Sequence, residues 1–270
     1  MKQTFTDPST VEYWYDLYKK NNFLGEIYRQ RKNVSVNFLP NLHLSGESLI
    51  LDAGCGPGTF SQQAAIKGYR VFGIDNSYEM VKKAGYICNS KEKLNVSFMQ
   101  GSIETLPFES SSFDVIVCLG VISYLSSEDK ALNEFSRILK PGGLLIISII
   151  NKARLVSRLD PINSVFLIIK NILRKVVFWK KDGRNRISVH KTYLIPKFRK
   201  SLELIGFRKI KYRTIPSQNL TFLGREIFPQ DIANNLIYFF EGFSNLPIVE
   251  SVGGMCIFKA EKKHFNLKKV

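Results

Sequence analysis

Short apolar runs alternate with amphipathic stretches along the chain, and this alternation predicts the fold. The runs that we expect to be strands are residues 49–51, 70–74, 96–99, 113–119, 144–150, 207–213 and 254–260. Helical spacing is expected at 10–20, 24–38, 60–67 and 77–84, and again before Gly206. Strands that alternate with helices are typical of a doubly wound, mostly parallel α/β sheet, whose ligand lies at the carboxyl ends of the strands.

A glycine-rich loop follows the first expected strand. Residues 49–59 read Leu-Ile-Leu-Asp-Ala-Gly-Cys-Gly-Pro-Gly-Thr. The glycines let the backbone approach a ligand closely, because no Cβ is in the way. A dinucleotide loop of the form Gly-x-Gly-x-x-Gly would need a glycine at Thr59, so that pattern fails. Asp52 would repel a pyrophosphate and attract a cation, which favours a cationic ligand.

This loop and its flanks resemble motif I of the class I S-adenosylmethionine-dependent methyltransferases, in particular the small-molecule branch that includes ubiquinone-biosynthesis enzymes. The resemblance implies a Rossmann-like methyltransferase fold with seven strands, the last inserted antiparallel beside the fifth. It implies S-adenosylmethionine as the cofactor, which has an ammonium group and a sulfonium but no phosphate. Gly54, Gly56 and Gly58 would then line the methionine end, and Asp52 would face the ammonium group directly or through water.

The rest of the expected cofactor site follows the second, third and fourth strands. Asp75 ends the second strand about 20 residues past the loop, where a carboxylate accepts hydrogen bonds from a ribose diol. The alternative is a carboxylate that caps the next helix. In related enzymes an Asp bonds the adenine where this chain has Ser102, so that contact would be weaker. The remaining residues expected near the cofactor are Asn76, Met80, Ile103 and Leu119.

The positive charge of the chain is concentrated in one segment. The chain has 39 Lys and Arg against 23 Asp and Glu, a formal net charge of +16. Residues 1–150 carry 15 of each sign, residues 151–215 carry 18 basic and 3 acidic residues, and residues 216–270 carry 6 and 5. Because the cofactor half is neutral, the positive field belongs to whatever the segment 151–215 contacts.

Within that segment, residues 165–177 have helical spacing with an apolar face and a face that carries Lys170, Arg174 and Lys175. The first interpretation is a lid helix whose basic face is in water. The second is a helix that lies on an anionic membrane surface, with contact through residues 152–186. Nucleic-acid binding is the least favoured interpretation, because no recognition motif or stacking pattern accompanies the charge.

The expected organisation has five parts. They are N-terminal helices covering the cofactor site (1–44), the S-adenosylmethionine-binding core (45–150), a basic amphipathic insertion or lid for the acceptor (151–200), the last helices and strands (201–262) and a basic tail (263–270). No signal peptide is evident, and the apolar runs are too short to span a bilayer. The four cysteines form no Cys-x-x-Cys pair, so we expect a cytoplasmic protein with reduced thiols and no metal site, peripherally membrane-bound under the second interpretation.

The expected activity is methylation of a small-molecule acceptor, with O-methylation preferred and an acceptor that is anionic or presented at an anionic membrane surface. The resemblance places His190 near the acceptor as a general base or substrate contact, with Tyr193 second. The segment 120–125 lacks the Asn/Asp-Pro-Pro-Tyr/Phe box of many base and amide N-methyltransferases. The alternatives are an RNA or protein methyltransferase and a non-catalytic S-adenosylmethionine-binding protein. The sequence does not predict an oligomeric state.

Overall fold

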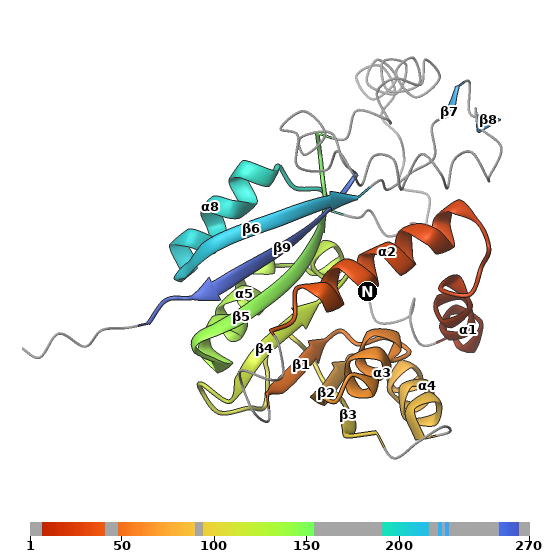
Figure 1. The fold of residues 1–270 in the computed structure, drawn as a ribbon, viewed down its shortest axis with the longest axis horizontal. Coiled ribbons are helices and arrows are strands. Elements are labelled where there is room, and N and C mark those ends of the chain that lie inside the picture. The colour runs from red at the N-terminus through yellow and green to blue at the C-terminus, as the bar shows by residue number, and fades with distance from the viewer. Residues whose placement is uncertain are drawn as a thin grey trace, which may run out of the picture.

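The computed structural model describes residues 7–40, 48–89, 94–153, 191–215, 221–222, 225–226 and 254–264. They form a seven-stranded sheet of order β3-β2-β1-β4-β5-β9-β6 and a separate two-stranded sheet, β7-β8 (Figure 1). The strands are β1 (Leu49–Ala53), β2 (Arg70–Asp75), β3 (Val96–Gln100), β4 (Phe113–Cys118), β5 (Leu139–Ile150), β6 (Phe207–Ile215), β7 (Thr221–Phe222), β8 (Arg225–Glu226) and β9 (Met255–Lys262). The helices are α1 (Pro8–Leu17), α2 (Phe23–Asn37), α3 (Thr59–Ile66), α4 (Tyr78–Asn89), the 3-10 helix η2 (Ile122–Tyr124), α5 (Glu128–Ile138) and α8 (Ile195–Ile205).

The topology confirms the expected doubly wound sheet. Strands β3, β2, β1, β4 and β5 are parallel to one another. Strand β9 is antiparallel to both β5 and β6, so it is the inserted last strand. Strands β1 and β4 lie side by side while the chain runs outward from them in opposite directions, and a crevice opens at such a switch point.

The sheet buries an apolar layer on each face. On one face Leu51, Ile116 and Ile147 pack with the apolar sides of α5 and α8. On the other face Ile50 and Val115 pack with α2 and α3. Successive residues of a strand point to opposite faces, so an apolar run such as residues 49–51 fills both layers. Figure 1 shows α8 beside β6, and α3 and α4 beside β2 and β3.

Two parts of the fold differ from the expected elements. Helix α5 was not predicted, although Ala131, Leu132, Phe135 and Ile138 have helical spacing and all four are buried. The expected strand at residues 144–150 begins earlier, at Leu139, so residues 140–143 are part of β5, with a register shift opposite residues 113–115 and with Gly142 at φ +78°. A bulge of this kind keeps the strand continuous while its pairing changes register.

Several expectations concern residues outside the described ranges. These are the amphipathic segment 165–177, His190 and most of the tail 263–270. Among the residues that the structure does describe, no helix is both long enough and apolar enough to span a membrane. The described part also contains no cluster of three or more potential metal ligands of the His, Cys, Asp and Glu types.

Candidate functional site

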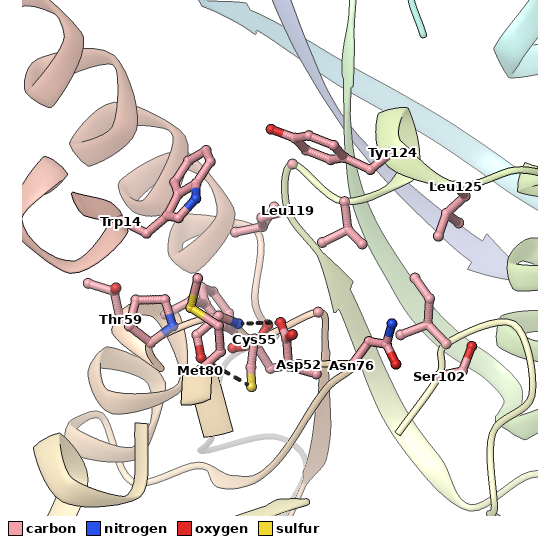
Figure 2. A pocket seen from close by; sticks show the side chains of 18 of the residues that line it. Trp14, Asp52, Cys55, Thr59, Asn76, Met80, Ser102, Leu119, Tyr124 and Leu125 are labelled. Atoms are coloured by element: carbon pink, nitrogen blue, oxygen red, sulfur yellow. Dashed lines mark hydrogen bonds between the residues drawn. The ribbon is translucent and has the colours of Figure 1, made fainter. Parts of the chain in front are cut away.

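A cavity of about 330 Å³ opens at the carboxyl ends of β1, β2 and β4. This volume lies within the range of small-molecule sites, about 300–1,000 Å³. Its lining combines the glycine loop, the end of β2, the loop after β3, helices α1 and α2, and residues 119–126 after β4. We call residues 119–126 the rim segment. In Figure 2, Trp14 and Tyr124 lie at the top of the cavity, with Asp52, Cys55 and Thr59 below them.

The glycine loop is held against β2 by its own backbone. The amides of Gly54 and Cys55 both donate to the carbonyl of Ile74, at 2.7 and 3.0 Å. Gly54 has φ +78°, and a Cβ at this residue would lie 2.3 Å from a methyl of Val121 on the rim segment. A larger residue would therefore push the loop and the rim segment apart. Gly54 and Gly56 line the cavity, as the sequence predicts.

Gly58 lies outside the cavity lining. It is the N-cap of α3 with φ +79°, and a Cβ there would lie 2.8 Å from the Cβ of Ala84 in α4. The close packing of α3 on α4 therefore requires a residue without a Cβ at this position, and this packing positions the loop.

This packing role gives a first prediction. Gly58→Ala should lower the free energy of unfolding by about 1–3 kcal/mol, because a non-glycine residue is strained at this φ and its Cβ meets Ala84. Gly85, inside α4, has open space around its position, so Gly85→Ala should be neutral or stabilise by up to about 1 kcal/mol. Urea unfolding of both variants is the measurement, and equal stabilities would contradict the assignment.

Asp52 lies at the bottom of the cavity and is only 2% exposed. The hydroxyl of Ser61 donates to its Oδ2 at 2.5 Å. Burial raises the pKa of Asp52 to about 7, against the opposing effect of the Ser61 hydrogen bond, and the charge of Asp75 adds to the rise. A cation bound here would favour the ionised carboxylate, because opposite charges attract strongly in a cavity of low dielectric.

Asp75 caps the next helix and also faces the cavity. Its Oδ1 accepts from the amide of Ser77 at the start of α4, and its Oδ2 accepts from the amide of Gly56, both at 2.9 Å. Burial raises its pKa even though these amides favour the charged form. The carboxylate also lines the cavity, together with Asn76 and Met80. A cap and a ligand contact are compatible, because a carboxylate accepts several hydrogen bonds.

Ser102, Ile103 and Leu119, all three of them predicted, also line the cavity, with Ser102 well away from Leu119 in Figure 2. The hydroxyl of Ser102 accepts from the amide of Glu104 at 3.2 Å, and a serine hydroxyl that accepts one bond can still donate another. Ile103 is 5% exposed and supplies an apolar wall. The part of the lining with Ser102 and Ile103 is therefore suited to a flat ring with a hydrogen-bonding edge.

Arg31 is the main residue that we did not predict. It lines the cavity from α2 and is only 5% exposed. Its Nη2 donates to the hydroxyl of Tyr18 at 2.8 Å, and its guanidinium lies 4.4 Å from the centre of the Tyr28 ring. Among the described residues, no carboxylate forms a salt bridge with it and its Nε has no hydrogen-bond partner. A buried cation of this kind is suited to an anionic group of a ligand.

Three aromatic residues also line the cavity. Trp14 of α1 makes an edge contact with Tyr28, with ring centroids 5.8 Å apart. Tyr18 accepts the bond from Arg31, and Tyr124 belongs to the rim segment. Burial raises the pKa of Tyr124, so its hydroxyl stays protonated at neutral pH. The aromatic run in residues 13–18 indicated a covering helix, but not which ring faces the cavity.

Of the two residues expected at the acceptor, the structure describes Tyr193 alone. His190 lies outside the described residues. The Tyr193 hydroxyl donates to the carbonyl of Ile122 at 3.3 Å, and its ring packs against Phe198. Tyr193 is absent from the lining of the cavity.

Comparisons with known proteins agree with this geometry. Residues 51–147, which include the glycine loop, Asp75 and Ser102, match the methyltransferase domain family. The uncharacterised methyltransferase YcgJ of Bacillus subtilis is 35% identical over 128 residues, which cover 46% of this chain and 51% of that protein. The ubiquinone biosynthesis O-methyltransferase of Coxiella burnetii is 30% identical over 103 residues, covering 38% of this chain and 44% of that protein. The chain thus spans about half the length of these relatives.

The fold is also that of solved methyltransferases. The magnesium protoporphyrin IX methyltransferase of Synechocystis, solved with bound SAH, aligns with a TM-score of 0.60 at 18% identity, covering 96% of this chain and 97% of that chain. At that identity the likeness supports the fold alone. The sequence matches, the sheet order and the cavity residues together establish that the chain contains a methyltransferase domain over residues 51–147.

Proposed function

We propose that the protein transfers a methyl group from S-adenosylmethionine to a small-molecule acceptor, with an oxygen as the preferred methylated atom. The observation that carries this proposal is the convergence of Asp52, Gly54, Asp75, Ser102 and Ile103 on one cavity. These residues come from separate elements between β1 and the loop after β3, and all lie within the matched domain. Two of the relatives that the chain matches are named O-methyltransferases.

The cavity residues fit this cofactor. Asp52 would face the ammonium group, and Arg31 would bind the carboxylate of the methionine part. Thr59 lines the same end, and its buried Oγ1 has no hydrogen-bond partner among the described residues. Asp75 would accept from the ribose hydroxyls. The adenine would pack on Ile103, with Ser102 at its edge.

The cofactor supplies a methyl group on a sulfonium, and the positive charge disappears as the methyl is transferred in line. The protein's contribution is to align the acceptor atom and to keep water out. Trp14, Tyr124 and Leu125 form the part of the lining suited to this task, because they are aromatic or apolar and come from α1 and the rim segment. We propose His190 as the general base or substrate contact, since it directly precedes Lys191 beside that segment.

We further propose that the acceptor is anionic or is presented at an anionic membrane surface. The support is the 18 basic and 3 acidic residues of segment 151–215. Residues 152–186 would make a peripheral contact with that surface by combining lysine and arginine with bulky apolar groups. The alternative activities are methylation of RNA or protein, for which the same charge would serve, and cofactor binding without catalysis.

Formation of S-adenosylhomocysteine over a panel of acceptors tests the activity. We expect turnover with phenolic, carboxylic or lipid-linked hydroxyl compounds, and a higher rate when anionic vesicles are present. Turnover only with RNA or protein would replace the proposed acceptor class. Cofactor binding with no turnover on any acceptor would favour the non-catalytic alternative.

Vesicle cosedimentation tests the membrane contact separately. The wild type should pellet with vesicles that contain anionic lipid and remain in solution with neutral ones. Replacing Lys170, Arg174 and Lys175 by Glu should abolish this binding, because it replaces three attractive charges by three repulsive ones. If that variant bound as well as the wild type, residues 152–186 would not be the membrane contact.

A further inference from the structure

The rim segment is too short to hold its own conformation. Its centre is the three-residue 3-10 helix η2, whose Ile122 is fully buried while Tyr124 lines the cavity. The internal backbone hydrogen bonds are those from Tyr124 to Val121 at 2.9 Å and from Leu125 to Ile122 at 3.4 Å. Carbonyls at the end of a short helix need donors from elsewhere.

Residues 191–193 supply those donors. The backbone amide of Lys191 donates to the carbonyl of Ser123 at 3.0 Å, and its ammonium donates to the carbonyl of Ser126 at 2.8 Å. The same ammonium forms a salt bridge of 2.9 Å with Glu128 in the first turn of α5. The Tyr193 hydroxyl donates to Ile122. Three carbonyls of the rim segment therefore accept hydrogen bonds from residues about 65 to 70 positions later in the chain.

Residues 191–193 are themselves fixed to the sheet. The amide of Tyr193 donates to Ile150 at 2.9 Å, and its carbonyl accepts from Lys152 at 2.8 Å. Tyr193 and Asn151 form a parallel bridge. Residues 150–152 and Tyr193 thus lie side by side at the end of β5. In the sequence, Lys170, Arg174 and Lys175 lie between these two paired stretches.

We infer that residues 191–193 are a brace that fixes the acceptor-side wall of the cavity, and that Lys191 and Tyr193 are positioning residues for methyl transfer. The catalytic part of this inference rests on the proposed function. The brace bonds the backbone carbonyls of Ile122, Ser123 and Ser126, whereas the side chains of Tyr124 and Leu125 in the same stretch line the cavity. Loss of the brace would let these two side chains move away from the acceptor.

The cofactor side should be insensitive to the brace. Asp52, Gly54 and Asp75 are held by bonds within β1, β2, α3 and the glycine loop, none of which involves residues 191–193. Gly120, at the start of the rim segment, is held separately by the hydroxyl of Ser148 at 2.8 Å. A change at Lys191 should therefore affect acceptor binding and leave cofactor affinity unchanged.

Lys191→Met tests the inference, since it removes the ammonium and keeps most of the aliphatic stem. Its matched control is Lys140→Met, which breaks a salt bridge to Asp114 of similar length and exposure, 2.7 Å with side chains 44% and 31% exposed against 38% and 31% for Lys191 and Glu128. We expect amide hydrogen exchange in residues 119–126 to rise about tenfold in Lys191→Met and to stay unchanged in Lys140→Met. Affinity for S-adenosylmethionine should change less than about threefold in both.

On an acceptor found in the panel above, Lys191→Met should raise KM about tenfold, and Lys191→Arg should restore most of the loss because arginine can donate to both partners. Tyr193→Phe should give a smaller change in the same direction, since its bond is long. Unchanged exchange in residues 119–126, in Lys191→Met and in the double variant with Tyr193→Phe, would overturn the brace. So would a tenfold loss of cofactor affinity. If exchange rises as expected but no acceptor is methylated, the brace stands and the proposed function fails.

Discussion

Arg31→Met should weaken S-adenosylmethionine binding by about 100-fold and leave the fold intact. Arg31 is a buried cation in the cavity, and the described residues offer it a phenol hydroxyl and a ring face but no carboxylate ion pair. Removing one member of a buried charged pair costs about 2–5 kcal/mol of binding free energy, which corresponds to about 30-fold or more. The carboxylate of the cofactor would lose its partner in this variant.

Isothermal titration of the cofactor measures this effect, and thermal unfolding without cofactor separates it from damage to the fold. The free Arg31→Met protein should be as stable as the wild type or more so, because a buried charge without an ionic partner has been replaced by an apolar side chain of similar length. Arg29→Met is the control on the same helix. It breaks the 2.7 Å pair with Glu26 and the hydrogen bonds from Arg29 to the carbonyls of Tyr18 and Lys20, but it removes no side chain of the cavity lining, so it should leave cofactor affinity unchanged. Equal loss of affinity in both variants would mean that α2 was displaced, not that a carboxylate contact was lost.

The strands and the cofactor loop could be predicted from the sequence because local pattern determines them. Residues 49–51 and 113–118 are mostly apolar runs of strand length. In the loop from Asp52 to Thr59, the residue types themselves indicate the kind of ligand that binds. The position of Asp75 followed from the same logic, because the carboxyl ends of parallel strands meet at one edge of the sheet. Ser102 was placed by resemblance to related enzymes. Helix α5 could have been predicted in the same way, because its apolar residues recur at helical spacing on one face.

The covering helices and the rim contacts could not be predicted in this way, because they depend on tertiary packing. Arg31 follows Ile27 and precedes Val34 on the buried face of α2. A basic residue at such an apolar position was the one feature of the sequence that could have indicated a cavity residue here. Nothing local indicates that this face meets Gly120, where a Cβ would lie 2.3 Å from the Arg31 guanidinium. Tyr193 was expected at the acceptor from resemblance, but its hydroxyl is bonded to the carbonyl of Ile122, and Tyr193 is absent from the cavity lining. Such contacts join residues far apart in sequence.

Cofactor affinity should fall by about 20-fold when the pH is lowered from 7.5 to 5.5. Asp52 has a pKa of about 7 in the free protein because burial penalises its charge, with Asp75 raising the pKa further and the Ser61 hydrogen bond and Arg31 lowering it. The ammonium group of the cofactor binds the ionised form. Affinity is therefore about half of its full value at a pH equal to this pKa and declines further as the carboxyl takes up its proton, by up to tenfold per pH unit.

The stability of the free protein should change with pH in the opposite direction, and this difference in sign makes the assignment specific. Folding raises the pKa of Asp52 from the ordinary value of 3.8. The contribution of Asp52 to the stability of the protein therefore falls as the pH rises through the same range in which cofactor affinity increases.

Asp52→Asn should abolish most of the pH dependence of binding and give weak affinity throughout. Asp75→Asn is the control, because Asp52 would still titrate in it. Titrations must stay below about pH 7.5, since an α-amino group loses its proton at about pH 7.7–8.0. If wild-type affinity were constant from pH 5.5 to 7.5, the carboxylate would not contact the ammonium group, and the electrostatic reason for preferring a cationic cofactor at this loop would fail with it.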